Sequence, residues 1–250
     1  MRKRLQSLLL LFLPLSLFAS DTLTLRPGSS GKDAVVWSNG SSRNYGNVNS
    51  TTIYTWTNNG SLGVKRAFLE FDLSAVPANA TIDSAKLSLY YITSGNNESF
   101  SVHTGGNAFW IERITSSWDE QTVDWNTQPS TTTAQRVHVD SSSSGTQDYP
   151  DLDVTALVRE MLDTSKGNYG FALKMQDEVN YYKGVLLASS DHSDSTLWPI
   201  LEIFYNGTPI CDAGFSHAVD SNNSVSFTAS SQAQGNSYHW DFGDLSSDTL

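Results

Sequence analysis

Two runs of alternating apolar and polar residues lie between Arg66 and Tyr91, in the sequence RAFLEFDLSAVPANATIDSAKLSLYY. Every second residue is apolar from Ala67 to Leu73, and again from Ala85 to Tyr91. This period of two predicts strands with one buried face. The segment between the runs contains a proline and turn formers, and it is too long for a two-residue hairpin. The two strands therefore need not pair with each other.

The same alternation recurs in short segments as far as residue 205. About ten strands with turn signals at short spacing predict an all-β fold, a β-sandwich. Because one compact helix and long loops fit two packed sheets, we expect a jelly roll. The further expected strands are 34–37, 51–57, 100–103, 110–114, 136–139, 171–176, 183–190 and 200–205.

One segment has a helical period instead. Asp153 or Thr155 can cap its start, and Gly167 lies where the chain must leave the helix. The apolar residues recur at the spacing of one helix face, at Val154, Leu157, Val158, Met161 and Leu162.

Residues 1–20 have the layout of a secretory signal peptide. A basic start at residues 2–4 precedes an apolar run from Leu5 to Phe18, and small residues lie near the cleavage point. The run is shorter than the ~20 apolar residues that a membrane span needs, so we expect cleavage rather than an anchor. No later segment is long and apolar enough to span a membrane. We therefore expect a secreted, extracellular or cell-surface protein.

The charge argues against a nucleic-acid partner. The full chain has 15 basic and 26 acidic residues and a net charge of −11. Three basic residues and no acidic ones lie in the predicted signal peptide, so the mature chain would carry 12 − 26 = −14. A chain this acidic repels DNA and anionic membranes unless a local basic patch or a bridging cation intervenes.

The sequence contains no recognisable catalytic constellation. None of the five histidines belongs to a His-x-x-x-His or His-Glu-x-x-His pattern, so a zinc site is not supported. Neither a Gly-x-Ser-x-Gly elbow nor a P-loop occurs. Adjacent carboxylates such as Asp119 and Glu120 point to opposite faces of a strand. We expect no catalysis here, which is compatible with a catalytic domain elsewhere in a longer protein.

A carbohydrate binder needs aromatic faces that stack on sugar rings and polar groups that fix hydroxyls. We expect Trp118 and Trp125 to fasten a long loop onto the sandwich. Aromatic residues beside other loops are the better stacking candidates, and a packing role is the alternative for each. These candidates are Trp37, Tyr45, Trp56, Trp110, Tyr181 and Tyr182.

An acidic polysaccharide would also need cations, because an arginine can bind a carboxylate with two hydrogen bonds. The candidates are Arg43, Lys65 and Arg66, with Lys174 and Lys183 on either side of the two tyrosines at 181–182. The alternative is that these are solvated charges at strand edges.

Calcium is a further candidate ligand, since Ca²⁺ takes six to eight oxygen ligands. Asp191 and Asp194 with neighbouring serines form one candidate cluster, Asp33 with Asn44 a second, and residues 148–153 a third. No spacing matches a known loop such as the EF-hand, so structural calcium is an expectation without a fixed site.

Several ordered segments carry a family resemblance. They are Asp33-Ala34 with Asn44-Tyr45-Gly46, RAFLEFDLSAVPANATIDSAKLSLY at 66–90, RITSSWDEQTVDWNTQP at 113–129, DVTALVREML at 153–162, NYGFAL at 168–173, Ala188-Ser189-Ser190, and PILEIFY at 199–205. In these residues the chain resembles the DNRLRE domain, also classed as carbohydrate-binding module family 96. The resemblance implies a carbohydrate-binding β-sandwich over residues 21–206, of a kind found in secreted multidomain proteins and reported to bind alginate-type acidic polysaccharide.

Residues 207–250 hold a second pattern, after a linker at Asn206-Gly207-Thr208-Pro209. The segment CDAGFSHAVDSNNSVSFTASSQAQGNSYHWDFGD resembles the first half of a PKD-type domain, an immunoglobulin-like extracellular spacer or adhesion unit. Leu245 stands where the motif of that family usually has a second glycine. The resemblance implies a truncated PKD-like domain, and hence a piece of a longer secreted protein.

Two hypotheses of function follow. The first is a non-catalytic carbohydrate-binding module that holds an acidic glycan such as alginate by stacking and hydrogen bonding. The second is a structural or adhesive cell-surface module without a sugar site. A binder requires a row of at least two exposed aromatic residues with basic or amide neighbours, and an adhesive spacer does not.

Overall fold

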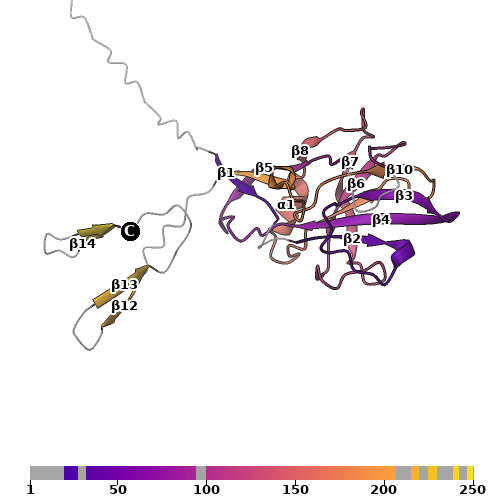
Figure 1. The fold of residues 1–250 in the computed structure, drawn as a ribbon. Coiled ribbons are helices and arrows are strands. Elements are labelled where there is room, and N and C mark those ends of the chain that lie inside the picture. The colour runs from indigo at the N-terminus through magenta and orange to yellow at the C-terminus, as the bar shows by residue number, and fades with distance from the viewer. Residues whose placement is uncertain are drawn as a thin grey trace, which may run out of the picture.

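The computed structural model describes residues 20–27, 32–93 and 100–206, together with the backbone of four later strands (Figure 1). Its main body consists of two antiparallel sheets. The smaller sheet contains, in spatial order, β1 (Asp21–Leu25), β11 (Ile200–Asn206), β5 (Thr81–Leu89) and β8 (Tyr149–Asp153).

The larger sheet has seven strands and a branch at its longest one. Its spatial order is β10 (Lys183–Val185), β3 (Ile53–Asn58), β4 (Ser61–Glu70), β9 (Phe171–Met175), β6 (Phe109–Ile114) and β7 (Thr131–Val139), and β2 (Lys32–Trp37) pairs with β4. Two short 3₁₀ helices also occur among the described residues, η1 (Ser38–Gly40) and η2 (Ser195–Leu197).

A single main hydrophobic core lies between the sheets. The alternating residues Ala67 and Leu69 of β4 and Leu87 and Leu89 of β5 all contribute to it, and each is completely buried. Burial of this alternating apolar face is the main force that holds the sheets together. The predicted β-sandwich with one short helix is confirmed.

The predicted helix is present as α1 (Thr155–Met161), with Leu157, Val158 and Met161 buried. It lies against β5, because Val154 donates a backbone hydrogen bond to the carbonyl of Ala85. Val154 occupies the N-cap position and makes no side-chain cap bond, whereas the carboxylate of Asp153, one residue before that position, accepts from the backbone N–H of Thr155 over 3.0 Å.

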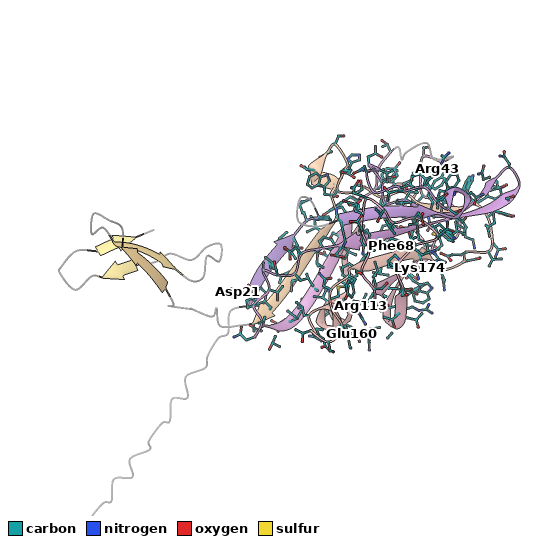
Figure 2. The ribbon with its side chains drawn as sticks, turned by 90° about the horizontal axis from the view of Figure 1, so that it is seen from below. Asp21, Arg43, Phe68, Arg113, Glu160 and Lys174 are labelled. Carbon is teal, nitrogen blue, oxygen red and sulfur yellow. The ribbon has the colours of Figure 1, made fainter. Side chains whose placement is uncertain are left out.

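A salt bridge of 3.0 Å between Arg113 of β6 and Glu160 ties α1 to the larger sheet (Figure 2). The helix is therefore joined to both sheets, through β5 on one side and β6 on the other.

The strands β4 and β5 lie in different sheets, so the expectation that they need not pair is confirmed. The outer face of β4 is partly covered by other residues and is not fully exposed to solvent. Phe68 is completely buried there, in a second apolar cluster with Trp118 and Val123. The indole of Trp118 also donates to the carbonyl of Tyr169 over 3.0 Å, which confirms that this loop is fastened onto the sandwich.

The strand predicted at residues 100–103 is wrong, since these residues form bends and loops. Phe100 packs on Trp56 and the ring of His103 makes hydrogen bonds, so tertiary contacts decide the conformation of this segment rather than its alternation.

The last part of the described chain contains two antiparallel pairs. β12 (Phe215–Val219) pairs with β13 (Val225–Ala229), and β14 (His239–Asp241) pairs with β15 (Ser247–Thr249). The predicted signal peptide up to residue 19 lies outside the described residues, and of the predicted linker at 206–209 only Asn206 is described, as the last residue of β11. No helix in the described ranges is both long and apolar enough to cross a membrane.

Candidate functional site

Polar and aromatic side chains line up across four neighbouring strands of the larger sheet, on the face turned away from the core. Trp110 of β6 pairs with Lys174 of β9 on one side and with His138 of β7 on the other. Arg66 precedes Ala67, whose partner on β9 is the residue before Lys174, so Arg66 and Lys174 project from the same face. With one further arginine of β7 these residues form what we call the outer strip: Arg66, Lys174, Trp110, Arg136 and His138.

The outer strip contains cations held against aromatic rings. The guanidinium of Arg136 lies 3.7 Å from the ring centroid of Trp110, and the imidazole of His138 lies 4.8 Å from it. At the other end, the guanidinium of Arg66 lies 4.8 Å from the ring of Trp125. Such cation–π contacts are favourable, and they fix the plane of each guanidinium.

A carboxylate lies beneath the cations of β7 and β9. Glu112 is almost fully buried and accepts a hydrogen bond of 2.8 Å from Lys174, while Arg136 approaches it to 3.6 Å. Burial alone would raise the pKa of Glu112, but the hydrogen bonds from Lys174 and Thr131 outweigh it and hold the pKa below its ordinary value. Glu112 is therefore a fixed anion that orients two cations, and it is unsuited to the role of a general acid.

The outer strip is close to neutral on a strongly acidic chain. Glu178 binds Arg66 with hydrogen bonds of 2.8 and 2.5 Å, and Glu112 faces the other two cations. Asp140 lies 3.4 Å from His138, so with the histidine counted as neutral three basic residues face three carboxylates and leave 3 − 3 = 0, whereas the chain as a whole carries −11. The exposed fractions of Arg136 and His138, 37% and 38%, leave both side chains accessible to a ligand.

A second group of aromatic residues, the aromatic corner, surrounds Trp56 beside the edge strand β10. Phe100 stacks on Trp56 with ring centroids 4.8 Å apart, and Tyr182 meets it edge-on at 5.0 Å. Tyr181 and Tyr182 are the exposed members, at 41% and 56%. The structure thus brings three predicted stacking residues together, and it places Phe100 over the ring of one of them.

The remaining predicted residues lie in a third place, around η1. Trp37 and Tyr45 meet edge-on at 6.4 Å, and the ammonium of Lys65 lies 5.7 Å from the Trp37 ring. Arg43 is exposed in the turn after η1. The predicted binding residues are therefore divided among three places, and of them Arg66, Trp110 and Lys174 belong to the outer strip.

The predicted calcium residues have different surroundings. Asp194 is exposed and its carboxylate accepts from the backbone of Thr196 over 2.9 Å, as the N-cap of η2. In the 148–153 cluster, Asp148 accepts from the backbone of Tyr91 and Asp153 from that of Thr155. These carboxylates have local structural partners.

Asp33 is the exception among the predicted calcium residues. Its carboxyl is completely buried, and one of its two oxygens has no hydrogen-bond partner. Desolvation raises the pKa of Asp33 to about 7, against the opposing effect of its hydrogen bonds with Ser190.

Residues 27–205 match the family model of carbohydrate-binding module family 96. The chain belongs to this family. The match covers every strand of the sandwich except β1, and so includes the outer strip, the aromatic corner and the surroundings of Asp33. Within the family 96 module, the alternation of Lys174 with core residues on its strand predicts that it lies on the outer face. Nothing in the sequence predicts that Arg136, His138 and Glu112 lie beside it, because the register between β6 and β7 is not visible in a single sequence.

The chain also resembles two curated proteins over part of its length. It is 25% identical over 143 residues to the tRNA nuclease WapA of Bacillus subtilis strain 168, and 24% identical over 159 residues to the tRNA3(Ser)-specific nuclease WapA of Bacillus spizizenii. These alignments cover 57% and 64% of this chain and 6% of each relative. The similarity therefore concerns one segment of much longer proteins.

Proposed function

We propose that this family 96 module binds an acidic polysaccharide of the alginate type on the outer strip, without cleaving it, as one unit of a secreted multidomain protein. The observation that supports this most directly is the pairing of cations with aromatic rings across one sheet face of an otherwise acidic chain. Family membership supports carbohydrate as the ligand, and the exposed guanidinium of Arg136, held on Trp110, supports an acidic one.

The geometry suits a chain of sugars more than a single ring. From β4 to β7 there are three inter-strand steps of about 4.8 Å each, so the strip is roughly 14 Å wide. A sugar carboxylate would accept from Arg136, and the ammonium of Lys174 would attract the next one. Because stacking on Trp110 already holds Arg136 in place, less side-chain entropy is lost when a ligand binds.

The non-catalytic part of the proposal rests on the state of Glu112. A glycosidase needs two carboxyl groups, one of them able to donate a proton. Glu112 is the carboxylate nearest to the centre of the strip, and its ion pairs hold it ionised. The small share of each relative that is matched supports the view that this is one module of a longer protein.

The first test is binding of the full chain to alginate, polygalacturonate and cellulose, measured by affinity gel electrophoresis and isothermal titration calorimetry. We expect binding to the two polyuronates and little to cellulose, with no release of reducing ends or unsaturated products on long incubation. Equal binding to cellulose would leave a carbohydrate binder but remove its acidic preference. Retention by none of the polymers would favour the structural or adhesive alternative.

The second test locates the site. Lys174→Gln and Arg136→Gln should each weaken alginate binding at least about fivefold, because each removes a charge-assisted hydrogen bond. Lys86→Gln is the matched control, since Lys86 lies on β5 in the smaller sheet and pairs with Asp153 at 3.5 Å. Undiminished binding by both strip variants, together with loss of binding in Trp56→Ala, would move the site to the aromatic corner.

A further inference from the structure

Four separate segments meet at the start of β2, around Asp33. The backbone N–H of Asp33 donates to the carboxylate of Glu120 over 2.9 Å, and its own carboxylate accepts from the N–H of Ser190 over 2.7 Å. The segment at 189–191 is in turn bonded to residues 48–49, because Ser189 donates its backbone N–H to the carbonyl of Asn49 and its hydroxyl to that of Val48. We call this meeting point the Asp33 junction.

The Asp33 junction brings three carboxylates together, and no basic side chain among the described residues forms a salt bridge with them. Asp191 and Glu120 both act on the carboxyl of Asp33 with like charge. Within the described residues, no lysine or arginine forms a salt bridge with any of these three carboxylates, and Lys32, the neighbour of Asp33, binds Glu70 at 3.0 Å instead. Burying a carboxylate without such a partner is expensive.

Two buried oxygens in the Asp33 junction have no hydrogen-bond partner. One is Oδ1 of Asp33, a residue with no exposed surface, and the other is Oδ1 of Asn49. Buried polar atoms in native proteins nearly always have a partner, so an orphaned pair in one place indicates a bound group. Both orphans are oxygen acceptors, and they therefore call for a cation or a donor rather than an anion.

We propose that the Asp33 junction is a Ca²⁺ site in which Asp33, Asn49 and Asp191 supply side-chain oxygens. No three acidic, histidine or cysteine side chains in the described part of the chain converge closely enough to hold a metal by themselves. Amide and backbone carbonyl oxygens must therefore complete the shell, and this mixed oxygen set suits Ca²⁺, whose coordination is flexible. Structural Zn²⁺ sites usually contain cysteine or histidine ligands, which this set lacks.

Such an ion would join parts of the chain that are distant in sequence. Asp33 is the second residue of β2, Asn49 precedes β3, and Asp191 follows β10, which pairs with β3. The expected role is to fix these loops to the edge of the larger sheet, independently of any glycan on the outer strip.

The test uses the full chain, stripped with EGTA and dialysed against metal-free buffer. Equilibrium dialysis with ⁴⁵Ca²⁺ at constant ionic strength should give one bound ion per chain. Thermal unfolding should rise by roughly 5–10 °C at a hundredfold excess of Ca²⁺ over Kd, and the same concentration of Mg²⁺ should give a much smaller shift. No bound Ca²⁺ and no shift would overturn the proposal, as would an equal shift with Mg²⁺, which would indicate general charge screening.

Variants decide which carboxylates are involved. Asp33→Asn should abolish the Ca²⁺ shift, and Asp191→Asn, an exposed position at which the fold is not at risk, should weaken Ca²⁺ binding at least about tenfold. Asp194→Asn removes the same charge three residues further along and should leave Ca²⁺ binding unchanged. Unaltered binding in Asp191→Asn, or loss of binding in Asp194→Asn, would overturn the proposed ligand set even if Asp33→Asn does not fold.

Discussion

His103 shows how one buried polar residue can join three segments. Its Nδ1 accepts from the backbone N–H of Leu186 over 3.1 Å, and its Nε2 lies 2.8 Å from the carbonyl of Gln147. These partners require the neutral ring with the proton on Nε2. Desolvation lowers the pKa of His103 below its ordinary value, although the nearby Gln147 carbonyl opposes this.

The free energy of unfolding should therefore depend on pH through His103. Because the folded-state pKa is lowered, the contribution is complete above the unfolded value of about 6.5 and is lost as pH falls below it. Urea unfolding at pH 7.5 and pH 5.0 measures this, with His103→Gln compared with the exposed His138→Gln. The loss on acidification should be smaller in His103→Gln than in the wild type, and unchanged in His138→Gln; equal losses in all three proteins would contradict the assignment.

The sequence Asn-Tyr-Gly occurs twice and builds the same local element each time. In both copies the asparagine Oδ1 accepts from the glycine N–H at 3.2 Å, and the asparagine amide donates to a distant carbonyl. In both copies a Cβ on the glycine would lie 2.1 Å from a backbone oxygen, that of Glu120 for Gly46 and that of Leu69 for Gly170. The motif thus acts as a clamp on a neighbouring strand or loop.

Gly170→Ala should consequently be strongly destabilising. Gly170 has φ +81°, and the added Cβ would collide with backbone that cannot move aside easily. We expect a loss of more than about 2 kcal/mol in the free energy of unfolding. Gly106→Ala is the control, because nothing lies within 4 Å of its Cβ position. A small effect at Gly170 in urea unfolding would show that β4 and β9 can separate locally.

The turn of the β3–β4 hairpin allows the energetic cost of a positive φ to be measured at a position where an added side chain meets no other atom. Its two-residue turn, Asn59-Gly60, has positive φ at both positions, and Asn58 pairs with Ser61 across it. No atom lies within 4 Å of a Cβ at Gly60. Gly60→Ala should therefore cost only the conformational term, about 1 kcal/mol, seen as a drop of roughly 2–4 °C in Tm. A drop much larger than this would reveal a contact that the turn makes elsewhere.

The sequence predicts a strand or helix well where the apolar residues of that segment alternate or recur with a clear period. The alternation in β4 and β5 and the helical period at α1 were sufficient, because burial of one face leaves a direct trace in the sequence. The Asn-Gly pair at 59–60 carries a hairpin signal, although the expected strands end at residue 57 and resume only at residue 66. Residues 100–103 alternate like a strand and form none, because their conformation depends on Trp56 and on the backbone of Leu186, which are distant in sequence.

At the scale of the whole molecule, the candidate surfaces could not be assembled from the sequence. Trp110 and Arg66 were recognised, but their proximity to Arg136 and His138 depends on strand order β4-β9-β6-β7 and on register. The aromatic corner likewise unites residues from β3 and the loop before β10. Composition indicates that such residues exist, and only the fold determines which of them meet.

The overall charge of −11 has a consequence for ligand binding. If an acidic glycan binds at the outer strip, the basic residues of the strip attract it and the acidic residues of the rest of the chain repel it. Both forces act over distances comparable to the Debye length, which is about 10 Å at 0.1 M salt. Raising NaCl from about 0.05 to 0.5 M should therefore weaken alginate binding, and Lys174→Gln should flatten that dependence. Titration calorimetry at several salt concentrations measures it, and binding that is insensitive to salt would argue against a charge-based interaction.

The pairing of β1 with β11 has a mechanical meaning. Asp21 lies opposite Tyr205, so the chain enters and leaves the sandwich at one point, with the two strands antiparallel. A pull on the chain from both sides would load the hydrogen bonds between β1 and β11 one pair after another, as in opening a zipper, instead of shearing them all together. Under tension, the sandwich would release its first strand at low force.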